Sequence, residues 1–194
     1  MNKRQSRIVI TIFLVGLLGF CLLFTFGLSP YLTGAADRSD AFSMLWRCMD
    51  ISNAEVLRVQ QVDEERWVRL LGVEAPRMDG APDLMEQAAR RGVDPAWLAR
   101  QGQVSRNTLS AWIMRRGLHI THPLGEEARD EEGRYWVYAE VAGIDIARKL
   151  LQGGQVYAAD IEHPRREQYV ALESEARERQ LGIWRPEAVG LLAE

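Results

Sequence analysis

Cysteine is scarce in this sequence, with only two residues among 194. Cys21 lies inside a long apolar run and Cys48 lies beyond it, so the part of the chain after that run has one thiol and cannot close an internal disulfide. No Cys-x-x-Cys pair occurs, which excludes the common cysteine-based zinc and redox motifs. Internal repeats and low-complexity tracts are also missing, which excludes repeat architectures.

Charge is absent from the stretch between Ile8 and Ala36, whose first part reads IVITIFLVGLLGFCLLFTFGLSPYL. A helix of roughly 20 apolar residues crosses the hydrocarbon core of a bilayer, so this run is long enough to span it with some tilt. The alternative is a cleaved signal peptide, whose apolar region is usually only about 7 to 15 residues long. The length therefore predicts an uncleaved transmembrane helix.

Basic residues are concentrated before the apolar run, at Lys3, Arg4 and Arg7, and only Arg38 lies close behind it. This asymmetry predicts a single-pass protein of the inner (cytoplasmic) membrane, with its N-terminus in the cytoplasm and its domain on the exterior, periplasmic side. The predicted organisation is a cytoplasmic tail (1–7), a transmembrane helix (8–33), a linker (34–43), a folded domain (44–186) and a C-terminal tail (187–194).

An excess of basic residues is missing from the rest of the chain. After residue 7 there are 21 Lys and Arg residues against 27 Asp and Glu residues, a formal charge of −6. Proteins that bind nucleic acid without sequence preference normally carry a basic surface. The composition therefore makes nucleic acid an unlikely partner without excluding it.

Beyond the linker, short apolar strands alternate with helices. A hairpin is predicted from two runs, 55–62 and 67–73, around a polar turn. Asp94 and Pro95 are typical of a helix start, although Gly102 is expected to weaken or break the helix that follows. The other expected elements are a helix at 83–91, strands at 118–122, 134–141 and 155–159, and helices at 143–152 and 164–181. This order predicts an α+β fold built around a small closed barrel with flanking helices.

Four segments in this order resemble the staphylococcal nuclease (thermonuclease) family. They are Arg69–Arg77 (RLLGVEAPR), Gly133–Arg134 at the start of a strand, the helix 144–152 followed by two glycines, and Glu175–Trp184 (EARERQLGIW). The resemblance covers about residues 48–184 and implies a five-stranded OB-type barrel with helices, a scaffold widely used for oligonucleotides.

The family's chemistry is phosphodiester cleavage, with calcium held by two Asp residues, a Glu acting on water, and two Arg residues stabilising the transition state. Arg69 and Arg134 match the two arginines. Glu74 and Glu55 stand where the metal-binding Asp residues belong, so they are the candidate metal ligands. Arg77 stands at the position of the catalytic Glu, and a guanidinium cannot accept a proton at neutral pH.

Two interpretations of these residues stay open. Arg69, Arg77 and Arg134 can form an anion-binding pocket, or they can form internal ion pairs, with Arg77 held by Glu74. Asp79 is a third possibility, as a substitute base, although its surroundings are typical of a turn.

Other polar and aromatic candidates have simpler explanations. His119 and His122 are three residues apart on an expected strand, so they point to opposite faces and cannot share a metal. His163 opens a basic helix start that is expected to be a solvated cap, and Trp46 is placed either in the core or at a membrane interface.

The leading hypothesis is a membrane-anchored, non-hydrolytic domain that acts as a binding or accessory subunit with a membrane-protein partner and no cofactor. The alternative is an extracytoplasmic, calcium-dependent nuclease with rearranged ligands, and a third interpretation is a non-catalytic nucleic-acid binder.

Overall fold

The computed structural model describes residues 45–185. In this range the strands are β1 (Trp46–Ile51), β2 (Val56–Gln61), β3 (Glu64–Leu70), β4 (Val73–Glu74), β5 (Gly117–Thr121), β6 (Tyr135–Val141), β7 (Ile144–Asp145) and β8 (Tyr157–Ala158). The helices are α3 (Leu84–Arg91), α4 (Pro95–Ile113), α5 (Ile146–Gln152), α6 (Arg166–Glu178) and the 3-10 turn η1 (Gly182–Trp184).

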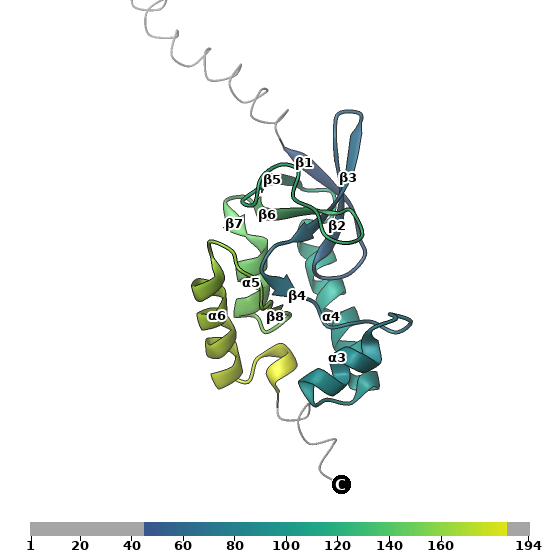
Figure 1. The fold of residues 1–194 in the computed structure, drawn as a ribbon, viewed down its shortest axis with the longest axis vertical. Coiled ribbons are helices and arrows are strands. Elements are labelled where there is room, and N and C mark those ends of the chain that lie inside the picture. The colour runs from purple at the N-terminus through teal and green to yellow at the C-terminus, as the bar shows by residue number, and fades with distance from the viewer. Residues whose placement is uncertain (1–44, 186–194) are drawn as a thin grey trace, which may run out of the picture. The chain divides into compact units, whose positions relative to one another are not determined.

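Five of the strands close into a barrel. Strands β1, β2 and β3 form an antiparallel meander, β3 then pairs in parallel with β6, and β6 returns through β5 to β1. In Figure 1 the barrel strands lie at one end of the domain, with α3 and α4 on one side and α5 and α6 on the other. The predicted α+β fold, a five-stranded barrel with flanking helices, is confirmed.

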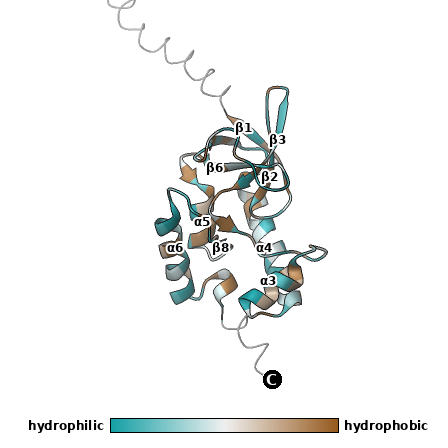
Figure 2. Ribbon diagram, viewed as in Figure 1, coloured by the Kyte–Doolittle hydropathy of each residue, from teal (hydrophilic) through white to brown (hydrophobic). Residues whose placement is uncertain are grey.

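The barrel core follows from alternating apolar residues on each strand. Leu57 and Val59 of β2, Leu70 of β3 and Val137 of β6 are fully buried in one cluster. Val62 closes the predicted strand 55–62, but β2 ends at Gln61 and Val62 lies at the hairpin turn with φ +52°, where it is exposed. The β2–β3 hairpin is largely hydrophilic in Figure 2.

Helix α4 begins as the sequence predicts but is not broken at Gly102. The Asp94 carboxylate caps it by accepting a hydrogen bond from the backbone N–H of Trp97 at 2.7 Å. A Cβ at Gly102 would lie 2.5 Å from the carbonyl oxygen of Pro76. Because glycine has no Cβ, the loop after β4 can lie directly on α4 at Gly102.

Trp46 and His163 are both buried, although a membrane interface was the alternative for Trp46 and a solvated cap was expected at His163. Trp46 opens β1 inside the barrel core, with the guanidinium of Arg66 5.0 Å from its ring. His163 is buried as well, and its Nδ1 hydrogen-bonds the hydroxyl of Tyr138 at 2.8 Å. The expectation of a solvated cap at His163 is therefore wrong, because the ring packs beneath α6 against Tyr169.

The predicted transmembrane helix (8–33) lies outside the described residues, as do the predicted cytoplasmic tail (1–7), linker (34–43) and C-terminal tail (187–194). Within residues 45–185, none of the helices combines the length and the apolar character needed to cross a membrane.

Candidate functional site

The loop Ala75–Arg77 carries the residue at the predicted base position, and it is held at both ends by one buried side chain. Gln87 of α3 accepts a hydrogen bond from the backbone N–H of Arg77 at 2.8 Å and donates one to the carbonyl of Ala75 at 3.0 Å. Sequence reasoning missed Gln87, because a glutamine on a short helix gives no signal of which loop it will face. With Gly102 beneath Pro76, this clamp fixes where Arg77 points.

Glu55 is the buried centre of the site, with a side chain only 2% exposed. Its Oε1 accepts hydrogen bonds from Arg69 at 3.1 Å and from Arg77 at 2.9 Å, and its Oε2 accepts one from the backbone N–H of Ala75 at 2.9 Å. Both oxygens therefore have partners, and Glu55 is not an ordinary surface carboxylate.

Arg77 spans two carboxylates. Besides Glu55, its Nε donates to Asp83 at 2.6 Å. Burial alone would lower the pKa of Arg77, but the charges and hydrogen bonds of Glu55 and Asp83 outweigh it and raise the pKa, so the guanidinium stays charged. The predicted partner, Glu74, is wrong: Arg77 turns toward the barrel, where it shares the buried charge of Glu55 with Arg69.

Asp130 joins the two family-matched arginines, and sequence reasoning missed it. Its side chain is 3% exposed and accepts from Arg134 Nε at 2.6 Å and from Arg69 at 3.5 Å. Burial alone would raise the pKa of Asp130, but hydrogen bonds from the backbone and side chain of Arg134 and the charge of Arg69 lower it. One feature of the sequence could have indicated this pair: Asp130 precedes Arg134 by four residues, and the turn glycine Gly133 lies between them.

Glu74 belongs to a separate cluster. Its two oxygens are bound by Arg90 and Arg91 of α3, and Arg91 also stacks on Tyr157. Burial alone would raise the pKa of Glu74, but a hydrogen bond from Gln87 and the two arginines hold it below its ordinary value.

These donors do not fit a calcium ion, which takes six to eight oxygen ligands. The oxygens of Glu55 and Glu74 are already committed to different arginines, and the guanidinium of Arg77 contacts Glu55 where a cation would be needed. No group of three or more His, Cys, Asp or Glu side chains suited to a metal occurs in residues 45–185.

A comparison with models of known protein families identifies the family of this domain. Residues 67–186 match the model of the staphylococcal nuclease homologue family. The chain belongs to that family. The match runs from within β3 past η1, so it includes Arg69, Arg77 and Arg134, whereas Glu55 lies before it. A comparison with curated proteins gave no match.

The structure thus brings most of the family-matched residues together and separates one. Arg69, Arg77 and Arg134 are linked through Glu55 and Asp130 into one chain of alternating charges. We call these five residues the charge chain. Glu74 is outside it, held by α3.

Asp79 is also outside the charge chain. It is exposed and lines a hollow of about 660 Å³ beside α4, together with Met78 and Pro95. In this position it does not meet the geometric requirement for a general base next to the arginines.

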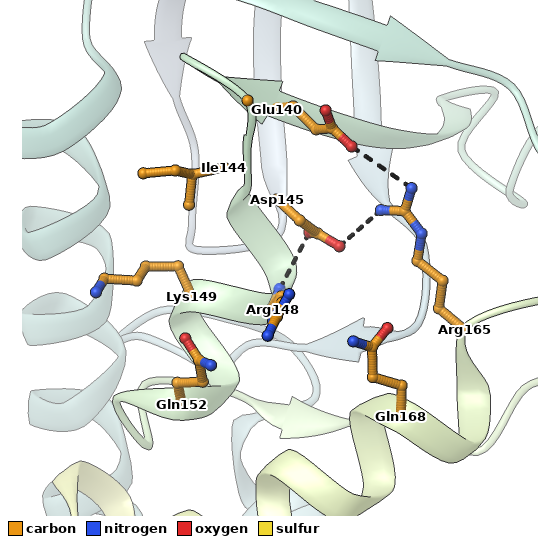
Figure 3. Close-up of a pocket in the computed structure, with 9 residues that line it drawn as sticks. Glu140, Ile144, Asp145, Arg148, Lys149, Gln152, Arg165 and Gln168 are labelled. Carbon is orange, nitrogen blue, oxygen red and sulfur yellow. Dashed lines mark hydrogen bonds and ion pairs between the residues drawn. The ribbon is translucent and has the colours of Figure 1, made fainter.

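A further hollow, of about 470 Å³, lies between β6, β7 and the helices α5 and α6 and contains no predicted site residue. Figure 3 shows Arg165 reaching from the start of α6 to Glu140 and Asp145. Asp145 also accepts a hydrogen bond from the hydroxyl of Tyr169 at 2.8 Å, so these contacts fasten α6 to the strands.

Proposed function

We propose that this protein is a single-pass inner-membrane protein whose exterior nuclease-family domain does not hydrolyse phosphodiesters and serves as a binding or accessory subunit of a membrane assembly. The observation that carries the proposal is the 2.9 Å contact between Arg77 and Glu55, with Asp83 on the other side of the guanidinium. A fixed positive charge occupies the place that the family's reaction requires for a proton acceptor and a metal.

Loss of a general base alone typically costs about 10² to 10⁴ in rate. The remaining acids of the charge chain do not replace it, because each already accepts hydrogen bonds from arginines. The carboxylate oxygens of Glu55 and Asp130 face guanidinium groups, which leaves them without the geometry of a base that accepts a proton from water.

The membrane and accessory parts of the proposal rest on the sequence. The charge-free run between Ile8 and Ala36 follows three basic residues, and the rest of the chain is acidic. An exterior domain without its own chemistry, held at a membrane, is suited to positioning another protein.

The hydrolytic part is tested with full-length protein in detergent and a fluorogenic single-stranded DNA, with calcium in excess. We expect no cleavage above background, and no difference between the natural chain and Arg134→Ala. Cleavage that disappears with a chelator and drops in Arg134→Ala would overturn the proposal and support the calcium-dependent nuclease. Calorimetry with calcium alone gives an independent readout, and we expect no binding that depends on Glu55 or Glu74.

The accessory part is tested by extracting the protein from its native membrane in a mild detergent. A 22.1 kDa chain in an assembly should migrate as a larger complex of fixed stoichiometry that survives a second purification step. Migration as a single chain in its micelle would contradict the accessory role, whatever the nuclease assay shows.

A further inference from the structure

Trp67 is an exposed aromatic residue beside the charge chain. It lies two residues before Arg69 on β3, so both side chains are on the same face of the strand. In the sheet Trp67 pairs with Arg58 of β2, and its neighbour Val68 pairs with Tyr135 of β6. Trp67 is 42% exposed, whereas Trp46 of the same barrel is buried.

The indole borders a hollow of about 440 Å³, a volume within the usual range of ligand sites. The hollow also includes Ser52, from the loop between the first two barrel strands, and Glu132, Gly133 and Arg134, from the loop between the last two. In OB-type barrels the face of the second and third strands and these two loops form the surface that binds oligonucleotides or oligosaccharides.

The charged side chains around the hollow balance each other. Three arginines and three glutamates line it, namely Arg66, Arg129, Arg134, Glu64, Glu65 and Glu132. Short ion pairs hold Arg66 to Glu64 at 2.5 Å and Arg134 to Glu132 at 2.5 Å, and Glu65 is bound by Arg58 at 3.1 Å. Arg129 lies on the ring of Tyr135 and 3.8 Å from Glu127. A surface that binds a nucleic-acid strand needs unpaired positive charge along the phosphates, which these pairs do not supply.

Paired Arg and Glu side chains instead present fixed donors next to fixed acceptors. Hydroxyl groups can bind such a donor and such an acceptor at the same time, because each hydroxyl donates one hydrogen bond and accepts others. A flat apolar ring beside such groups suits the apolar face of a sugar.

We propose that the Trp67 hollow binds a neutral oligosaccharide, with one sugar ring lying on the indole of Trp67 and its hydroxyls bonded to the Arg134–Glu132 and Arg66–Glu64 pairs. This site goes beyond the proposed function and does not depend on it. The nuclease assay does not report on Trp67, so failure of either proposal can be told from failure of the other.

The experiment uses the full chain in a detergent without a sugar headgroup, since an alkyl glycoside would compete. Cellotetraose, maltotetraose and chitotetraose are each tested by saturation-transfer NMR and calorimetry. We expect at least one of them to bind, with an affinity that is nearly independent of salt. Trp67→Ala should weaken binding by about tenfold or more, the loss typical when a stacking platform is removed, and Trp67→Phe should retain part of the affinity.

Met85→Ala is the matched control, because Met85 is a large exposed apolar residue (67%) on α3 and does not border the hollow. Glu132→Gln is a second variant at an exposed position, and it should weaken binding without affecting the fold. The proposal is overturned if none of the three sugars binds at millimolar concentration, or if binding is unchanged in both Trp67→Ala and Glu132→Gln. Salt-sensitive binding of oligothymidine that requires Trp67 would assign the hollow to a nucleic acid instead.

Discussion

Arg77 stands at the position where the family is expected to have a proton-accepting glutamate, so a side-chain cation takes the place of a base. A guanidinium carries one positive charge and five donors in a fixed plane, and it cannot be exchanged with solvent as a metal ion can. Here it neutralises Glu55, which is almost fully buried and would be costly to leave unpaired. The charge chain is therefore expected to stabilise the fold rather than to carry out catalysis.

Arg77→Ala should lower the free energy of unfolding by about 3 kcal/mol, because it leaves a buried carboxylate with one of its two arginines. The measurement is urea unfolding of the full chain in one detergent, followed by circular dichroism. Arg58→Ala is the control, because its ion pair with Glu65 is exposed and should contribute less than about 1 kcal/mol. Equal effects of the two substitutions would show that the Arg77–Glu55 pair has no special structural role.

At the scale of elements, α6 is joined to the barrel through a buried histidine. Nδ1 of His163 accepts a hydrogen bond from the backbone N–H of Arg165 at 3.3 Å and lies 2.8 Å from the Tyr138 hydroxyl, which fits a neutral ring. A Cβ at Gly72 would lie 2.4 Å from this ring, which places the histidine directly beneath the turn that leads into β4. The imidazole ring is therefore packed tightly between α6 and that turn.

This contact predicts that acid destabilises the domain. Burial lowers the pKa of His163, and the charges of Arg166 and Arg165 lower it further against the opposing effect of Glu162. As pH falls below about 6.5 the unfolded chain takes up a proton before the folded one does, so stability decreases until the lower folded-state pKa is reached. The free energy of unfolding should therefore fall between pH 7 and pH 5 (about the range in which histidine titrates).

His163→Asn removes the titrating group and keeps a polar side chain that can accept from Tyr138. Its stability at neutral pH should be lower than that of the natural chain, but its dependence on pH should be flatter. An unchanged slope in this variant would assign the acid sensitivity to His122, whose pKa is also lowered by burial and by the charge of Arg66. The lowered pKa values of Asp130 and Glu74 matter only at more acidic pH.

At the scale of the whole molecule, the expected arrangement is a domain on the exterior side of the membrane, joined to its anchor by a short linker. The linker between residue 34 and the start of β1 is about 12 residues, which spans at most about 40 Å when extended.

The orientation can be tested with single cysteines in a Cys21→Ser background. Ser39→Cys should react with a membrane-impermeant maleimide in intact cells, and Asn2→Cys should react only after permeabilisation. The natural Cys48 should contribute little background, because burial and the nearby Asp50 raise the pKa of its thiol to about 11 and leave little reactive thiolate. The reverse labelling pattern would place the domain in the cytoplasm.

The family and the barrel can be predicted from the sequence, because the alternating apolar residues of β2 and β3 and the Asp94–Pro95 helix start act locally. The pairing of the charged residues, in contrast, depends on how the chain folds. Arg77 pairs with Glu55, 22 residues away, and Arg69 reaches Asp130 across 61 residues. Charge attraction is not specific to one partner, and a chain with 24 basic and 27 acidic residues offers many possible pairs. The barrel selects among them by burying Glu55 and Asp130, since a buried carboxylate must be paired while an exposed one need not be.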